Sequence, residues 1–361
     1  MRYGLLTILL VAGWALFDME NKEWPPTGLW STSIRPSFDA KLHVLRRDYD
    51  IPGLVYGILR DGVIQPLSAQ GQTADGTRPV STDSIFLLAS LSKPITAAAV
   101  LVLASRGKLP LDAPVDQWFN DLSGNTGITV RELLNHSSGI DTRGVNMVAA
   151  AAAHPEPSQF ARYLLSRPLA FTPGRFGHYD NGNYVVLSAL ITRVCGCEYA
   201  TFVRQKVLEP LRMTQTRFGT PPAAWKPGTA YLQPSFDITG LLGAGGWTAP
   251  AIDLLRFLEH WQARLGLDSS VLEEVDDSYT RPDSLGNGRK YGLGWHLHET
   301  VDNKRPIRRH YGSLPGAFSQ IGDCGNGDGW IVLLNSRPTN RAADRTLDGR
   351  LFEMFSQRAC S

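Results

Sequence analysis

The sequence predicts an α/β fold of the α+β type, in which one antiparallel sheet is built from both chain ends and flanked by helices, with a mainly helical domain inserted. Two observations support this prediction. Segments rich in valine, isoleucine and tyrosine, typical of strands, lie near the start of the chain and again after Tyr291. In residues 109–234, apolar side chains recur mostly at helical spacing instead.

The predicted elements follow in chain order. Residues 38–49 carry apolar side chains at helical spacing, and Asp50-Ile51-Pro52-Gly53 ends this helix. Asp61-Gly62 is a hairpin-turn signal between two strand-like runs. Predicted strands lie at 54–59, 63–68, 292–297, 308–312, 317–322 and 330–335. Further helices are predicted at 130–134, 149–153, 159–165, 184–194, 199–208 and 341–357.

This pattern divides the chain into a leader and two domains. Met1-Arg2 precedes an apolar run, residues 3–17, which is too short to span a bilayer comfortably and fits a signal peptide. We therefore expect residues 1–20 to be a signal peptide or an uncleaved N-terminal anchor, and the protein to be exported, periplasmic or secreted. Residues 36–89 and 236–361 form the predicted sheet domain, and residues 90–235 form the helical domain, with the active site between the two.

Charge and cysteine content limit the partners. A formal net charge of +2 provides no basic surface for a nucleic acid, so none is expected, and a membrane is expected only through the N-terminal segment. Four cysteines in an exported chain permit two disulfides, with three possible pairings. A Cys-x-Cys pair is not expected to bridge to itself, so we expect one disulfide or buried free thiols. No cysteine or histidine cluster has metal-ligand spacing. The cysteines are Cys195, Cys197, Cys324 and Cys360.

A candidate nucleophile lies at the start of a helix that the apolar run 97–103 would bury. Ser90 and Lys93 are three residues apart, a spacing that places both side chains on one helix face. An amine whose pKa is lowered by burial can accept the serine proton, and the helix N-terminus favours an oxyanion at Ser90. A second Ser-x-x-Lys match, Ser105 to Lys108, follows the apolar run and is interpreted as the end of the same helix.

Two further motifs follow in a fixed order: Tyr179-Asp180-Asn181 and His310-Tyr311-Gly312. With Ser90-x-x-Lys93, they make the chain resemble the serine β-lactamase-related family, which includes class C β-lactamases, D-Ala-D-Ala carboxypeptidases, D-aminopeptidases and esterases. The resemblance covers residues 42–355 and implies a β-lactamase/transpeptidase-like fold. Further landmarks are Leu133-Leu134-Asn135-His136-Ser137-Ser138-Gly139, Pro173-Gly174, Ala244-Gly245-Gly246, Asp253-Leu254 and Tyr291-Gly292-Leu293-Gly294-Trp295.

The resemblance implies a role for each motif residue. Ser90 would be the acylated nucleophile and Lys93 its first partner. Tyr179, as a phenolate or through a proton shared with Lys93, would be the general base. The implied substrate-binding residues are Asn181, His310, Gly312 and Ser313, with the backbone N–H groups of Ser90 and Ser313 as the oxyanion hole.

The remaining histidines of these motifs, His136 and His178, are expected to be structural. The resemblance implies a serine hydrolase without metal or cofactor, acting on carboxylic esters or small amides and peptides. A D-Ala-D-Ala carboxypeptidase, a D-aminopeptidase and a β-lactamase remain alternatives, as does a non-catalytic penicillin-binding or sensor protein.

The third motif has a histidine where many relatives have a lysine. Because histidine is mostly neutral at pH 7, His310 predicts weak anchoring of a substrate carboxylate, which should improve as the pH falls towards 6. Strand alternation places Arg308 on the same face, where it could partly replace the missing cation. We therefore expect uncharged short-chain esters to be better substrates than penicillins.

Overall fold

The computed structural model describes residues 37–119, 126–219, 237–267, 269–277, 280, 290–299, 305–338 and 340–360. The chain divides into two compact units, Met1–Leu42 and His43–Ser361. The predicted signal segment, residues 1–20, lies outside the described residues, as do parts of the predicted domains. The first helix, α1 (Phe38–Asp48), spans the boundary between the units. All features described below belong to the second unit.

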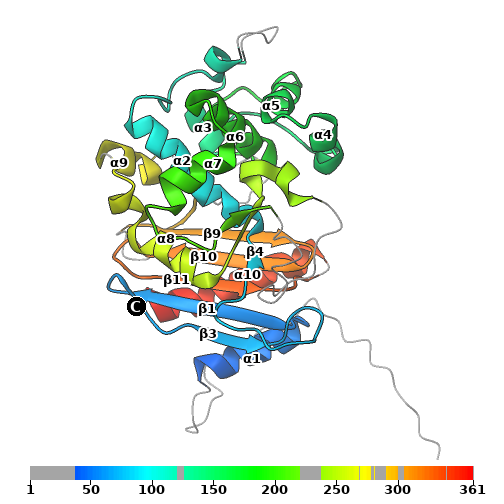
Figure 1. The fold of residues 1–361 in the computed structure, drawn as a ribbon, viewed down its shortest axis with the longest axis vertical. Helices are drawn as coiled ribbons and strands as arrows, with labels where there is room; N and C mark the ends of the chain where they lie inside the picture. Colours follow the sequence, from blue (N-terminus) through cyan, green and yellow to red (C-terminus); the bar gives the residue numbers. More distant parts are fainter. Residues whose placement is uncertain are drawn as a thin grey trace, which may run out of the picture. The chain divides into compact units, whose positions relative to one another are not determined.

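One antiparallel sheet combines strands from near the start of the second unit with strands from near its end, as predicted. Its order is β2-β1-β11-β10-β9-β8-β7, and β3 pairs with β1 outside this path. Leu54 in β1 pairs with Leu334 in β11, and Figure 1 shows these two strands side by side. The strands are β1 (Gly53–Arg60), β2 (Val63–Ile64), β3 (Ser68–Gly71), β7 (Lys290–Tyr291), β8 (His296–His298), β9 (Ile307–Leu314), β10 (Ala317–Asp323) and β11 (Gly329–Leu334).

Helices cover both faces of this sheet. In β1, Tyr56 packs edge-on against Phe355 of α10 (Arg341–Ala359). The next residue, Gly57, faces Leu255 of α8 (Ala251–Arg264), and a β-carbon there would lie 2.5 Å from that leucine. Because successive strand residues point to opposite faces, α8 and α10 lie on opposite sides of the sheet. This is why nearly all of β1 is buried, rather than every second residue.

The helical region surrounds one apolar helix, α2 (Ser92–Ser105), which is buried from Ser92 to Leu103. A small sheet of β4 (Phe86–Leu87), β6 (Trp247–Ala249) and β5 (Arg217–Phe218) leads into it. A 3-10 turn, η1 (Ala89–Leu91), joins β4 to α2. The other elements are η2 (Val115–Trp118), α3 (Val130–Leu134), α4 (Met147–Ala153), α5 (Pro157–Leu165), α6 (Asn181–Cys195), α7 (Tyr199–Val203), η3 (Arg204–Leu208), η5 (Ile238–Ala244) and α9 (Ser269–Asp277).

All four cysteines form disulfides, which corrects the expectation of one bridge or free thiols. Cys195 ends α6, and Gly196 follows in the left-handed conformation at φ 65°. This reversal brings the Cα atoms of Cys195 and Cys197 to 5.2 Å, within the range that a disulfide needs. The pair therefore bridges to itself, contrary to our expectation.

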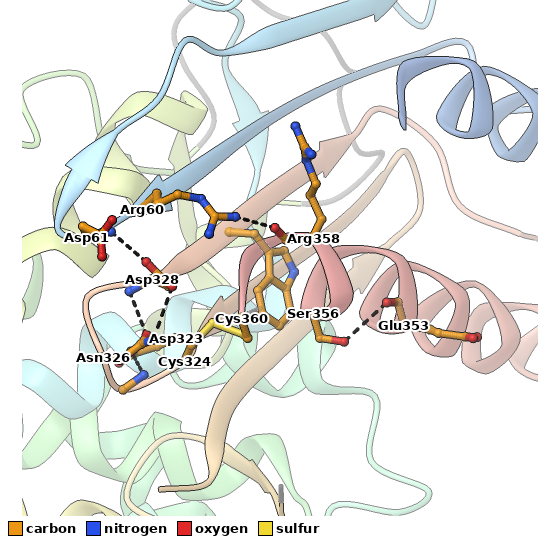
Figure 2. The surroundings of a disulfide bond; sticks show 12 residues. Arg60, Asp61, Asp323, Cys324, Asn326, Asp328, Glu353, Ser356, Arg358 and Cys360 are labelled. Carbon is orange, nitrogen blue, oxygen red and sulfur yellow. Dashed lines mark hydrogen bonds between the residues drawn. A yellow bond between two sulfur atoms is a disulfide. The ribbon is translucent and has the colours of Figure 1, made fainter. Parts of the chain in front are cut away.

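The second disulfide ties the last helix to the sheet. Cys324 lies in the turn between β10 and β11, and Cys360 directly follows α10 (Figure 2). Nearby, the Arg60 guanidinium donates to the Arg358 carbonyl at 2.6 Å.

In the described part of the chain, no single helix is long and apolar enough to cross a membrane. The bent pair Asn181–Cys195 and Tyr199–Leu208 meets that test only when its two helices are taken together.

Candidate active site

The proposed nucleophile lies at a strained junction between the two sheets and α2. Ser90 is in η1, directly before α2 rather than inside its first turn. The preceding residue, Ala89, is buried and has φ 49°, a left-handed conformation that alanine rarely adopts. The Leu88 carbonyl accepts from Ser319 Oγ of β10 at 2.8 Å. The large sheet therefore helps to hold the chain that presents Ser90.

Lys93 lies fully buried at the centre of the site. Its Nζ donates to three acceptors, Ser90 Oγ, Asn181 Oδ1 and the Ala244 carbonyl, each at 2.9 Å. Burial lowers the pKa of Lys93 from 10.5 to about 7, while the negative charge of Asp180 opposes this shift. Near neutral pH, a substantial fraction of Lys93 is therefore an uncharged amine in contact with Ser90.

Tyr179 contacts the same serine from another side. Its hydroxyl is hydrogen-bonded to the Ser90 side chain, and Lys93 Nζ lies 4.8 Å from its ring centroid. The residue exposes 40% of its surface, while its hydroxyl is desolvated. Desolvation raises the pKa of Tyr179 well above 10, and nearby Tyr311 raises it further. Tyr179 is therefore a neutral phenol at pH 7, which argues against the phenolate form that the resemblance allowed.

The amine of Lys93 thus connects the motif that contains Ser90 to the motif that contains Tyr179 and Asn181. Asn181 comes from the first residue of α6, where the Asp180 side chain caps the helix by accepting from Gly182 N at 2.7 Å. The cap fixes the start of α6 and therefore the position of Asn181 at its first residue. The structure brings Ser90, Lys93, Tyr179 and Asn181 together as the sequence motifs indicate.

His310 is buried, and both of its ring nitrogens have partners within the protein. Nε2 lies 3.0 Å from the Tyr291 hydroxyl, and Nδ1 lies 2.8 Å from the Tyr311 carbonyl. The carbonyl can only accept, so Nδ1 carries the proton and Nε2 accepts from Tyr291. Burial is the main reason that the pKa of His310 lies well below 6.5, and the nearby Lys93 lowers it further. The expected improvement of carboxylate binding as the pH falls towards 6 therefore loses its basis.

Arg308 does not replace the missing cation. Its guanidinium donates to Asp276 at 2.7 Å and to Asp323 at 2.9 Å, and the residue is only 4% exposed. Arg309, on the other face, pairs with buried Asp348 through two bonds of about 3 Å. The carboxylates of Asp276 and Asp323 neutralise Arg308. Our expectation that Arg308 could partly replace the missing cation is therefore wrong.

Gly312 of β9 lies against the nucleophile, as expected of a residue next to an oxyanion hole, and Ser313 follows it in the strand. A β-carbon at Gly312 would lie 2.9 Å from Ser90 N and 2.2 Å from the Leu88 carbonyl, so only glycine fits. Ser313 Oγ donates to Asp344 Oδ2 at 2.7 Å and accepts from Arg337 Nη1 at 3.2 Å. Sequence analysis missed Asp344 and Arg337, which belong to no motif.

One group of described residues offers several possible metal ligands close together. Asp141, His178 and Asp180 place ligand atoms within 4.8 Å of one another. The Asp180 carboxylate already accepts from Gly182 N and from Thr142, and Asp141 pairs with Arg143 at 2.7 Å. These two carboxylates therefore have protein partners without a metal ion.

Comparisons with known proteins agree with this geometry. Residues 38–351 match the model of the family described as "Beta-lactamase". Penicillin-binding protein 4* of Bacillus subtilis is 29% identical over 266 residues, 66% of this chain and 58% of the relative. Esterase EstB of Burkholderia gladioli is 32% identical over 206 residues, 52% of each chain. This chain therefore matches little more than half the length of these relatives.

Solved structures with the same fold include a penicillin-binding protein homologue from Pyrococcus abyssi. It has a TM-score of 0.72 and 23% identity, covering 88% of this chain and 78% of its own. A D-amino acid amidase from Ochrobactrum anthropi has a TM-score of 0.73 and 23% identity, covering 86% of this chain and 94% of its own. The family model covers most of the chain, and this chain belongs to the beta-lactamase family.

Proposed function

We propose that this protein is a serine hydrolase that forms an acyl-enzyme at Ser90, most readily from uncharged carboxylic esters. One observation carries the proposal: fully buried Lys93 has a pKa of about 7 and lies 2.9 Å from Ser90 Oγ. A buried lysine with a lowered pKa is suited to accept a proton from a neighbouring hydroxyl.

Acylation would use Lys93 as the first proton acceptor. The neutral amine takes the Ser90 proton while Oγ forms a bond to the substrate carbonyl carbon. The backbone N–H groups of Ser90 and Ser313 would stabilise the resulting oxyanion. Tyr179 starts as a neutral phenol hydrogen-bonded to Ser90, so it donates its proton to the leaving group and recovers one from Lys93. The leaving group departs protonated, and Lys93 is again neutral.

Hydrolysis would follow the reverse order. Water attacks the acyl carbon and passes a proton, through Tyr179 and Lys93, back to Ser90 Oγ as the acyl bond breaks. Because Lys93 must begin each half-reaction uncharged, turnover should rise with pH through about 7 and level off above it.

The charges around the site support an ester without a carboxylate. His310 is held as the neutral form by its two partners, and Arg308 is committed to Asp276 and Asp323. Neither offers a fixed positive charge to a carboxylate of a penicillin or a D-Ala-D-Ala peptide. The named function of a relative, Esterase EstB, is in line with this substrate class.

A hydrolysis screen tests the proposal directly. p-Nitrophenyl butyrate, a chromogenic cephalosporin and a D-amino-acid amide are compared by kcat/KM, and a fluorophosphonate labels the nucleophile. We expect the butyrate ester to be the best substrate and the wild type to gain one adduct that Ser90→Ala lacks. The matched control, Ser105→Ala, should label and turn over normally. A preference for the cephalosporin would refute the ester assignment, and stoichiometric labelling without turnover would indicate a non-catalytic binding protein.

We also infer that the protein is exported to the periplasm or the medium, with an uncleaved N-terminal anchor as the alternative. The apolar run after Met1-Arg2 supports this inference. The pairing of all four cysteines supports it too, because disulfides persist mainly in oxidising compartments.

A further inference from the structure

We propose that His136 is a positioning residue that fixes the orientation of Tyr179. This inference rests on the proposed function, in which Tyr179 carries a proton between Lys93 and the leaving group. His136 was expected to be merely structural. Its contacts instead converge on the catalytic tyrosine from several directions.

The main chain on both sides of Tyr179 is bonded to His136. The amide of His178, the residue before Tyr179, donates to the His136 carbonyl at 2.7 Å. The amide of Asp180, the residue after it, donates to His136 Nδ1 at 3.2 Å. One residue therefore holds the backbone of the Tyr179 segment at both flanking positions, which limits how far Tyr179 can rotate or shift.

The imidazole ring also packs against the tyrosine ring. The centroids of His136 and Tyr179 are 4.4 Å apart at an interplanar angle of 38°. The other neighbours of this imidazole are Tyr184, at 5.2 Å, and Tyr291, at 4.6 Å and nearly perpendicular. His136 itself is only 1% exposed, so the ring is fixed among these aromatic side chains.

His136 also connects Tyr179 to the helix that carries Asn181. The Asn183 side-chain amide lies 2.9 Å from His136 Nδ1, and Asn183 Oδ1 accepts from Ser138 Oγ at 2.5 Å. Asn183 belongs to the first turn of α6, which begins at Asn181. His136 thus sets the relative placement of Tyr179, which contacts Ser90, and Asn181, which contacts Lys93.

The backbone of His136 has an unfavourable conformation that this placement requires. Its φ is 63°, in the left-handed region that residues other than glycine seldom adopt. Six described residues other than glycine have a positive φ. Three of them lie close in the chain to Ser90 or to a partner of Tyr179 or Lys93; they are His136, Ala89 and Leu242. Ala89 precedes Ser90, and Leu242 lies two residues before Ala244, whose carbonyl accepts from Lys93.

The role of His136 is geometric, because its ring does not exchange a proton near neutral pH. Nδ1 accepts from the Asp180 amide, so the proton of the neutral ring is on Nε2. Nε2 is buried without a hydrogen-bond partner. Burial, followed by the positive charge of Lys93, lowers the pKa of His136 well below 6.5. The tyrosines around the ring stay neutral, since burial raises the pKa of each; they are Tyr179, Tyr184 and Tyr291.

Two substitutions separate the backbone contact from the ring contact. His136→Asn tolerates a positive φ and can still accept from the Asp180 amide, but it lacks the ring. His136→Ala loses both of these side-chain contacts and keeps only the main-chain bond from the His178 amide. With p-nitrophenyl butyrate, we expect kcat to fall about 10-fold in His136→Asn and about 100-fold in His136→Ala, the scale of a misplaced catalytic group. KM should change less than threefold, and His154→Asn, a distant control, should match the wild type.

A double-mutant cycle shows whether His136 acts through Tyr179. In a Tyr179→Phe background, His136→Asn should lower kcat less than threefold further, because the hydroxyl it positions is already absent. An equal loss in both backgrounds, or no loss in either, would overturn the proposal.

A second measurement does not depend on activity. With 13C-labelled tyrosine, relaxation of the Tyr179 ring should show greater mobility in His136→Asn and His136→Ala than in the wild type, while Tyr199 is unchanged. Unaltered Tyr179 mobility in both folded variants would also refute the inference. If the wild type neither hydrolyses esters nor labels with a fluorophosphonate, the proposed function fails, and the relaxation experiment still decides whether His136 holds Tyr179.

Discussion

Replacing Lys93 by methionine should change how stability depends on pH, by an amount that follows from the buried amine. In the unfolded chain the lysine has a pKa of about 10.5, and in the folded protein about 7. Between these values the unfolded state binds one more proton, so the wild type gains stability as the pH rises. The penalty for burying the charged amine, about 5 kcal/mol, is fully present below pH 7 and is relieved towards pH 10.5.

Methionine has a similar volume but no proton to lose. From pH 7 to pH 9.5, the free energy of unfolding of the wild type should therefore rise by about 3 kcal/mol relative to Lys93→Met. The three acceptors that lose their donor, Ser90 Oγ, Asn181 Oδ1 and the Ala244 carbonyl, add an offset that does not vary with pH.

Urea unfolding at half-unit pH steps measures this difference. Lys108→Met, at an exposed position just after α2, is the matched control and should run parallel to the wild type. Parallel curves for the wild type and Lys93→Met over this range would show that the amine is not held at a lowered pKa. The proposed proton transfer from Ser90 would then lack its physical basis.

Two further predictions concern the disulfides and the N-terminus. Replacing Cys324 and Cys360 by alanine should lower the free energy of unfolding by about 3 to 4 kcal/mol, because their bridge closes a loop of 36 residues. Removing the Cys195–Cys197 bridge should cost about 1 kcal/mol, and equal losses in urea unfolding would contradict this reasoning. Expressed in a bacterium, the protein should appear outside the cytoplasm by fractionation, and N-terminal sequencing decides between a cleaved signal and an anchor. Full-length protein confined to the cytoplasm would count against export.

The fold and the motif residues of the site are predictable from local pattern. Strand-like segments at both ends of the sequence and helical periodicity between them correctly predict the sheet of β1 and β9 to β11. Ser90 and Lys93 share a helix face, so their contact follows from spacing alone. The meeting of Tyr179 and Asn181 with them comes from the family resemblance, because 88 residues separate Asn181 from Lys93.

The remaining features depend on tertiary contacts or on single backbone torsions. The Ala244 carbonyl is a main-chain acceptor, and any residue type could supply it. Arg308 is neutralised by Asp276 and Asp323, which lie in other segments and give no pattern around the arginine. The bridge between Cys195 and Cys197 depends on the left-handed turn at Gly196.

The pairing of β1 with β11 also determines when the sheet can be completed during synthesis. Gly53 N donates to Asn335 Oδ1 at 2.8 Å, across 282 residues. At about 5–20 residues per second, a ribosome needs roughly 15 to 55 seconds to supply that partner after β1 has emerged. During this interval β1, an apolar segment without proline, has only β2 and β3 beside it and an unpaired edge towards the missing strand. Folding should therefore be slow, since its contacts are so distant in sequence, and the nascent chain is most prone to aggregate before Gly329–Leu334 is made.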